Sequence, residues 1–389
     1  MISASNTSSW VSYNLYPEYE VIFDTDHDYL EDNIELEIAE KFKPVLHKHS
    51  YDLQQGLANL ENYIVDGKFN LKVWTDQPQL AFDQQVSGDS SALHKWYIWH
   101  WDTYGKGSQS QAEQYNLNLN NSYRYSAAPT GQRPLYYHVY KNEGESYYYV
   151  QYWYYFGMND LREQIPDTWH ESDWEHVSIR LIKDGDTYIP DKVNFYLHDG
   201  GKTYSDSQCW WSSTNSLSYN GIQQGYDESH THLHIWIAAN AHASYNRYSR
   251  VYSVVGWVFG SLYRTYKDRL DYEPSNYDLY FNYDTLIKLG EISKQATIKC
   301  PDSGYTLSFH CYPTGPGSKH WLAYRGRMGD YDGDPGAAPP PPFMPAKEVG
   351  LSHEWRSFTV GNSFGNNGDV NYIVIIVDLC WIIDNGVGD

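Results

Sequence analysis

The aromatic run YYYVQYWYYF (147–156) and the alternating run HVSIRLI (176–182) decide the fold of this chain. Apolar residues at every second position are typical of β-strands, because successive side chains of a strand point to opposite faces. The runs KVNFYLH (192–198) and LHIWIA (233–238) alternate in the same way, and Gly, Asp and Asn lie between the runs. The sequence therefore predicts an all-β protein, a two-sheet β-sandwich with an N-terminal helix and long surface loops.

The composition of the 389 residues favours a well-packed protein with a polar or cationic partner. Aromatic residues make up 17% of the chain, a content that disordered chains lack. The formal net charge is −21, the opposite sign from the one that an unassisted binder of nucleic acid or anionic lipid needs. We expect no nucleic-acid partner, and we expect the chain to recruit cations or neutral polar molecules.

Helices are predicted at two places. Apolar residues recur at every fourth position from Leu30 to Phe42, and Pro44 ends this helix. A short second helix is expected at Thr285–Leu289. The first helix is predicted to have a solvated face, formed by Glu31, Glu35, Glu37 and Glu40.

The chain is expected to divide into three parts. Residues 1–41 form an N-terminal extension with the amphipathic helix, and residues 42–345 form the β-sandwich domain with a divalent-cation site. Residues 346–389 form C-terminal strands that pack on the same domain. Within the second part, the Pro/Gly-rich stretch 329–345 predicts an extended surface loop.

No transmembrane span and no signal peptide are predicted. The longest apolar stretch, YIVIIVDLCWII (372–383), is too short to span a membrane and contains Asp378, so it predicts a buried strand. The N-terminus MISASNTSSW lacks the basic and apolar regions of a signal peptide, so the chain is either cytosolic or begins after a removed signal.

The cysteines leave the redox compartment open. Cys300 and Cys311 flank a turn and could pair across a hairpin, but the sequence does not choose among the three possible full pairings. The four cysteines are Cys209, Cys300, Cys311 and Cys380.

The segment HESDWEHV (170–177) is the sharpest chemical feature. Asp173 and Glu175 are two residues apart, so on a strand they share the apolar face of Val177, where two carboxylates are costly to bury without a cation. His170 can fold back to the same place from the preceding loop, and Asp160 can approach it from a neighbouring strand. These oxygen-rich ligands favour Ca²⁺, Mg²⁺ or Mn²⁺ over Zn²⁺. The alternative is that both strand carboxylates lie in water and accept hydrogen bonds from backbone amides.

The histidine-rich segment HTHLHIWIAANAHASY (230–245) is the second feature. On an unbroken strand, His230, His232, His234 and His242 would line one face, and a His-x-His pair is a known transition-metal arrangement. No third zinc ligand is identifiable, so His230 and His232 are expected at a solvated strand entry. His242 follows an apolar run, where it either lines a pocket at the end of the sandwich or is a hydrogen-bonded core histidine.

QYWYYFGMND followed by HESDWEHVSIRLI resembles the core of the necrosis-inducing NLP cytolysins, in which an aromatic strand ending in Asp precedes a His-x-x-Asp-Trp-Glu segment. Together with FKPVLHKHS (42–50), NAHASY (240–245) and RGRMG…APPPPF (325–343), these segments are also similar to the vacuolar protein sorting-associated protein 62 family. That second resemblance spans roughly residues 40 to 345.

The NLP resemblance implies a divalent cation held by Asp160, Asp173 and Glu175, with His170 nearby or water-mediated, and His242 at the same end of the sandwich. It also implies a toxin-like activity on sugar-bearing sphingolipid head groups, and it favours a secreted protein. The NLP heptad reads Gly-His-Arg-His-Asp-Trp-Glu. Here Trp169 replaces its Gly, and Glu171 and Ser172 replace its Arg-His.

Three functions are compatible with these residues. The first is divalent-cation-dependent binding of a polar small molecule, a glycan or a lipid head group. The second is a metal-dependent hydrolase or lyase, with His242 or His170 as acid or base. The third is a purely structural ion in a partner-binding protein. The ligand, the metal, the compartment and the oligomeric state stay open.

Overall fold

The computed structural model describes residues 30–74, 80–86, 115–142, 144–160, 169–197, 200–213, 221–247, 253–258, 262–267, 279–289, 294–299, 306–311 and 329. The C-terminal strands predicted within residues 346–389 lie outside these residues, as does all but the first residue of the predicted loop at 329–345.

The described chain is mostly β-structure, as predicted. Its elements are α1 (Asp32–Phe42), β1 (Val45–Lys48), α2 (Leu60–Val65), β2 (Phe69–Trp74), β3 (Leu80–Val86), β4 (Tyr115–Leu119), β5 (Pro134–Tyr140), β6 (Tyr147–Asp160), β7 (Trp169–Asp184), β8 (Thr187–Leu197), β9 (Gly200–Ser205), β10 (Trp210–Ser212), β11 (Gln223–Gln224), β12 (His232–Ile237), β13 (Ser244–Tyr245), β14 (Ser253–Val258), β15 (Leu262–Lys267), β16 (Leu279–Tyr280), β17 (Thr285–Lys288), β18 (Lys294–Lys299) and β19 (Thr306–Cys311).

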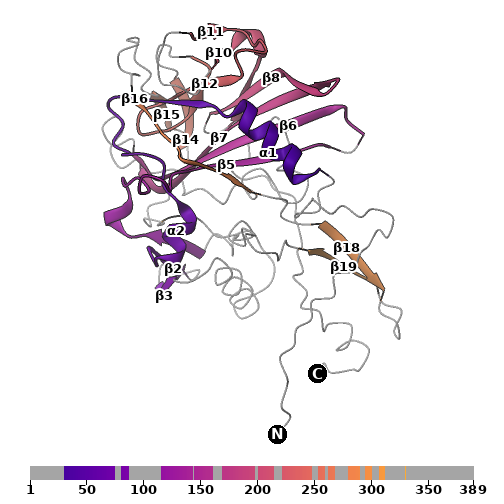
Figure 1. Cartoon of the computed structure of the whole chain (residues 1–389). Coiled ribbons are helices and arrows are strands. Elements are labelled where there is room, and N and C mark those ends of the chain that lie inside the picture. The colour runs from indigo at the N-terminus through magenta and orange to yellow at the C-terminus, as the bar shows by residue number, and fades with distance from the viewer. Residues whose placement is uncertain are drawn as a thin grey trace.

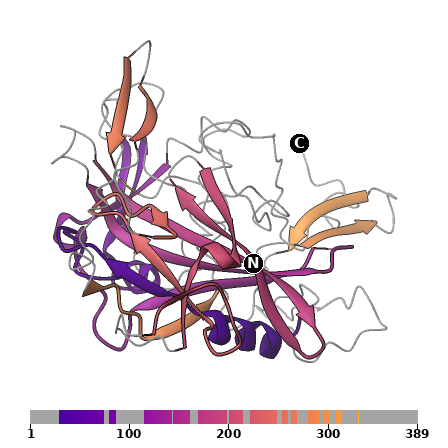
Figure 2. The same ribbon diagram turned by 90° about the horizontal axis from the view of Figure 1, so that it is seen from above.

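Two sheets of six strands form the body of the protein. The central sheet has the order β17-β5-β6-β7-β8-β9, and the second has the order β11-β10-β12-β1-β16 with β13 paired to β12. All described pairs are antiparallel except β17 with β5 and β1 with β12. The long strands β6 and β7 run side by side through the centre of the fold (Figures 1 and 2). A small sheet, β3-β2-β4, lies near α2 (Figure 1).

The two large sheets enclose one apolar core. On the core side of the central sheet lie the alternate residues of β6 and β7, such as Tyr152, Tyr154 and Ile179. The second sheet contributes Leu46 from β1 and Ile235 from β12 to the same core. The structure is therefore an all-β sandwich, which confirms the fold predicted from the alternation.

Helix α1 packs against the central sheet, as its four-residue repeat predicted. Ile38 and Phe42 are buried in the core, and the hydroxyl of Tyr152 donates a hydrogen bond of 2.8 Å to the carbonyl oxygen of Ala39. The solvated glutamate face was predicted wrongly at one position, because Glu35 is fully buried and forms an ion pair with Lys288. No described helix is long and apolar enough to cross a membrane.

One local prediction between residues 280 and 311 is wrong. Residues Thr285–Lys288 form strand β17, because they pair in parallel with β5, and not the predicted short helix. The β18–β19 hairpin pairs Cys311 with Lys294 and Lys299 with Thr306. Cys300 lies outside the described residues, so its possible pairing with Cys311 stays a prediction. Cys209 is a buried free thiol.

Candidate functional site

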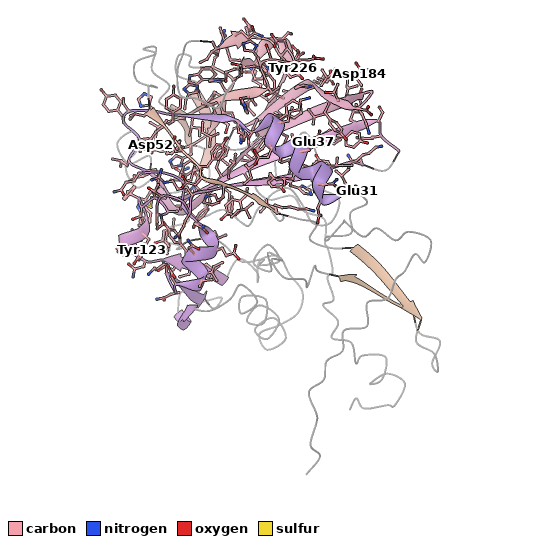
Figure 3. All side chains as sticks on the ribbon, in the orientation of Figure 1. Glu31, Glu37, Asp52, Tyr123, Asp184 and Tyr226 are labelled. Atoms are coloured by element: carbon pink, nitrogen blue, oxygen red, sulfur yellow. The ribbon has the colours of Figure 1, made fainter. Side chains whose placement is uncertain are left out.

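The end of β6 and the start of β7 carry the predicted site residues. In their antiparallel register Asp160 is opposite Trp169, and Phe156 is opposite Asp173. Asp160, His170, Asp173 and Glu175 are all buried. The site lies at the opposite end of β7 from Asp184, on the side where Asp52 is labelled (Figure 3).

A tight turn after β12 brings His242 onto this end of the sheet. Strand β12 ends at Ile237, and the amide of His242 donates to the carbonyl of Ala238 at 3.0 Å. The imidazole stacks on Phe156 with 3.9 Å between ring centroids, and its Nδ1 lies 2.8 Å from Oδ2 of Asp173. Strand β12 therefore ends before His242, so His242 does not continue the row of even-numbered histidines.

Asp52 is a further site residue, which the sequence did not single out. Its Oδ2 lies 3.5 Å from Nε2 of His242, so the imidazole stands between the carboxylates of Asp52 and Asp173. Asn159 is also new, because its amide donates to Oδ2 of Asp173 at 3.2 Å. The only sequence signal for Asp52 is its position just after FKPVLHKHS, one of the segments that carry the family resemblance.

The two carboxylates control the charge of His242. Complete burial lowers the pKa of an imidazole, but here the charge of Asp52 and the hydrogen bonds of Asp173 and Asp52 outweigh burial and raise the pKa to about 9. His242 is therefore an imidazolium at neutral pH, and it neutralises part of the buried negative charge.

His170 has the opposite electrostatic character. Burial lowers its pKa, although the charge of Asp173 acts against this shift, so the ring is neutral at pH 7. Its Nδ1 lies 2.8 Å from the carbonyl oxygen of Ser172. An Nδ1–H that donates to this carbonyl leaves the lone pair on Nε2, the arrangement in which a histidine ligates a metal.

The remaining predicted ligands, Asp160 and Glu175, each lie beside a tyrosine. The hydroxyl of Tyr125 donates to Oδ2 of Asp160. Glu175 is opposite Tyr154 in the β6–β7 register. Burial first and the charge of Glu175 second raise the pKa of that phenol well above its usual value. Phe156 and Tyr154, which are opposite Asp173 and Glu175, both lie in the apolar core, so the two carboxylates share one side of β7, as the spacing predicted.

The backbone of this region adopts unusual conformations. Ser172, Asn240 and His242 have positive φ angles of 61°, 63° and 53°, in the left-handed region that residues with a side chain rarely adopt. In the part of the chain that the structure describes, these are the non-glycine residues with positive φ. The candidate site consists of Asp52, Asp160, His170, Asp173, Glu175 and His242. His242 is thus itself a site residue, and Ser172 and Asn240 lie within two residues of Asp173 and His242 in the chain.

The four predicted metal ligands thus lie in one region, but their side chains do not form a coordination sphere. Within the described ranges, no group of three or more His, Cys, Asp and Glu side chains is arranged to hold a metal ion. The donor types suit a hard cation, and binding would require these side chains to converge.

The other histidines do not join the candidate site. His230 and His232 are half-buried at the entry to β12, as predicted. His234 is buried and hydrogen-bonds through Nδ1 to Nε2 of His47 at 2.7 Å. Burial lowers the pKa of His234 to about 2. His232, His234 and His242 therefore contact three different partners, the carbonyl of Lys43, the ring of His47 and the carboxylate of Asp173.

A buried ion pair supports the start of β7 from outside the site. Oε1 of Glu171 accepts two hydrogen bonds from Arg124, and Oε2 accepts one from the amide of Leu119 at 2.8 Å. Glu171 thus joins β7 both to the last residue of β4, Leu119, and to Arg124, which follows β4 in the chain. Nothing in the sequence distinguished Glu171 from the neighbouring acidic residues.

The chain is similar to several solved structures of NLP proteins. One is necrosis and ethylene inducing protein 2 from the causal agent of cocoa's witches' broom disease, at 13% identity over 54% of this chain and 67% of that chain, with a TM-score of 0.27. Others are NLPPya in complex with glucosamine (13%, 55% and 67%, TM-score 0.27) and the non-toxic HaNLP3 protein (13%, 66% and 74%, TM-score 0.28).

TM-scores this low assign neither a ligand nor an activity to this chain. No protein-family model and no curated protein matches the sequence. The resemblance to the vacuolar protein sorting-associated protein 62 family therefore has no support from these comparisons and stays a prediction.

Proposed function

We propose that the candidate site binds a polar ligand, a glycan or a glycolipid head group, through a divalent cation. Asp160, Asp173 and Glu175 would supply carboxylate oxygens, and His170 would supply Nε2 or hold a water molecule. Ca²⁺ or Mg²⁺ fits these donors best, Mn²⁺ fits them as well, and Zn²⁺ fits them less well.

One observation carries this proposal: buried carboxylates and left-handed backbone concentrate at the same end of the sandwich. Each residue held at positive φ costs roughly 1–3 kcal/mol, and such strain clusters at functional sites. Ser172 directly precedes Asp173 in the chain, and His242 hydrogen-bonds to Asp173 through Nδ1. A fold that needed these residues only for packing would gain stability from a relaxed backbone here.

Two aromatic residues that adjoin site residues in the chain support a sugar-like ligand. Tyr51 precedes Asp52 and is 51% exposed, and Trp169 precedes His170 at the start of β7. Aromatic rings suit the apolar faces of sugars, and a hard cation coordinates hydroxyl oxygens. The acidic net charge of the chain disfavours a strongly anionic ligand in the absence of that cation.

The first test is the metal content of the protein by elemental mass spectrometry. We expect about one Ca, Mg or Mn per chain in the wild type and its loss in Asp173→Asn. The matched control is Asp191→Asn, which removes a carboxylate from an ion pair with Arg180 elsewhere on the central sheet. Because Asp173→Asn could unfold, the wild type is also stripped with chelator and then reloaded.

The second test is binding to glycan and lipid arrays before and after removal of the cation. Binding that disappears with chelator and returns with Ca²⁺ or Mg²⁺ supports the proposal. A protein that takes up none of these cations refutes it. Unchanged array binding after cation removal, with a lower unfolding temperature, would assign the ion a structural role instead.

The hydrolase or lyase alternative stays a prediction. His242, one of its two candidate acid–base residues, is fully buried between Asp52, Asp173 and Phe156 in this arrangement. Turnover that is lost in both Asp173→Asn and His242→Ala would favour this alternative over ligand binding alone.

A further inference from the structure

Asp52 joins two loops that are far apart in the sequence. Its side chain is completely buried in the loop after β1. Oδ1 accepts a hydrogen bond of 2.8 Å from the amide of Gln54, which closes the local loop. Oδ2 accepts one of 3.1 Å from the amide of Asn240, which belongs to the turn after β12. One carboxylate therefore fixes both loops at the same time.

The second loop returns a contact to the first. Oδ1 of Asn240 accepts a hydrogen bond of 2.9 Å from the amide of Leu53. The carbonyl oxygen of Asn240 also accepts a hydrogen bond of 2.9 Å from the amide of Asp160, the last residue of β6. The turn is thus held between the loop after β1 and the end of the central sheet.

This turn needs such support. Asn240 and His242 both have left-handed backbone conformations, which persist only where surrounding contacts hold them. His242 must keep its conformation for Nδ1 to reach Asp173. Asp52 contacts both strained residues, through the amide of Asn240 and through Nε2 of His242.

We propose that Asp52 is a positioning residue of the candidate site: it holds the 239–243 turn, and through it the contact between His242 and Asp173. Its effect on a ligand rests on the proposed function, whereas its effect on His242 does not. Asp52 itself is not counted among the cation ligands. Residues that orient metal ligands from outside change metal affinity by about 10–100-fold when they are replaced.

The experiment compares three variants with the wild type. Asp52→Ala removes both acceptors, and Asp52→Asn keeps one oxygen that can accept from the amide of Asn240. Asp191→Ala is the control, since it removes a carboxylate that is 27% exposed and pairs with Arg180. Circular dichroism confirms that each variant is folded. Mn²⁺ affinity is then measured by calorimetry.

We expect Asp52→Ala to weaken Mn²⁺ binding by about tenfold or more, and Asp52→Asn to stay within about threefold of the wild type. Asp191→Ala should bind like the wild type. Wild-type affinity in Asp52→Ala would overturn the inference. An equal loss in the Asn and Ala variants would also overturn it, because charge and not loop position would then be responsible.

A second readout separates this inference from the proposed function. In protein labelled with ¹⁵N-histidine, the ring nitrogens of His242 are assigned by comparison with His242→Gln. If the wild type binds no Mn²⁺, the cation proposal fails, but Asp52→Ala should still shift both ring nitrogens as the contact with Asp173 is lost. Unchanged His242 resonances in a folded Asp52→Ala variant would refute the positioning role.

Discussion

Acid should destabilise this protein through His176, a histidine on the face of the central sheet away from the apolar core. Its ring is stacked between Trp153, at 3.9 Å between centroids, and Tyr196, at 4.5 Å. Among the residues that the structure describes, neither ring nitrogen has a hydrogen-bond partner. Burial lowers the pKa of His176 to about 3, so the folded protein keeps this ring neutral well below pH 6.

The size of the effect follows from the two pKa values. In the unfolded chain the ring titrates near 6.5, so as the pH falls below that value the unfolded state binds a proton that the folded state does not. Between pH 7 and pH 5 this difference removes about 2 kcal/mol of stability. The loss continues to grow until the pH approaches 3, where the folded ring also becomes protonated.

Urea unfolding at pH 7 and at pH 5 measures this contribution. In His176→Phe, which keeps an aromatic ring between Trp153 and Tyr196, the stability lost on acidification should be about 2 kcal/mol smaller than in the wild type. His234, with its pKa lowered to about 2, acts in the same direction and remains in the variant. Val177→Ala is the control, because it weakens the same strand without removing a titrating group.

An equal loss of stability in the wild type and in His176→Phe would refute this reasoning. It would mean that the ring takes up a proton in the folded state, and that burial in the aromatic stack does not keep it neutral. A smaller loss in Val177→Ala than in the wild type would show that the assay reports general destabilisation.

Three further predictions concern packing and are tested by urea unfolding at pH 7. Gly157→Ala should cost about 1–3 kcal/mol of stability, because the new Cβ would lie 2.6 Å from the carbonyl oxygen of Arg124. A variant as stable as the wild type would mean that the backbone at Arg124 moves aside freely. Glu171→Gln should cost about 2–4 kcal/mol, since it leaves the Arg124 guanidinium without its carboxylate; the reasoning fails if the cost is below the error of the assay. Tyr152→Phe should cost about 1 kcal/mol through the lost hydrogen bond to Ala39, and no change would show that water replaces the hydroxyl.

The sequence predicted the fold correctly where its pattern is local. The alternation of 176–182 and the four-residue repeat from Leu30 to Phe42 each depend on neighbouring residues, and both elements form as expected. The prediction failed at Thr285–Lys288, where pairing with β5 overrides the local preference. It failed at Glu35 for a similar reason, because the partner Lys288 lies 253 residues away.

The residues of the candidate site region also differ in whether local sequence was enough to predict them. The two-residue spacing along β7 was enough to place Asp173 and Glu175 on one face. The NLP resemblance predicted His242 at the same end of the sandwich. Glu171 and Asn159 could not be recognised, because their roles depend on β4 and on the 239–243 turn, which lie elsewhere in the chain. No periodicity identifies such partners.

By itself, the sequence determined the strand pattern, the helix of the N-terminal region and the carboxylates at the start of β7. These features follow from the period of side chains along a strand or a helix, which is a property of adjacent residues. Only the tertiary structure decided that His242 is charged, because that charge depends on Asp52 and Asp173 meeting the ring from opposite sides. Asp52 and Asn240 are 188 residues apart, and only the packing of β1 beside β12 brings their loops together.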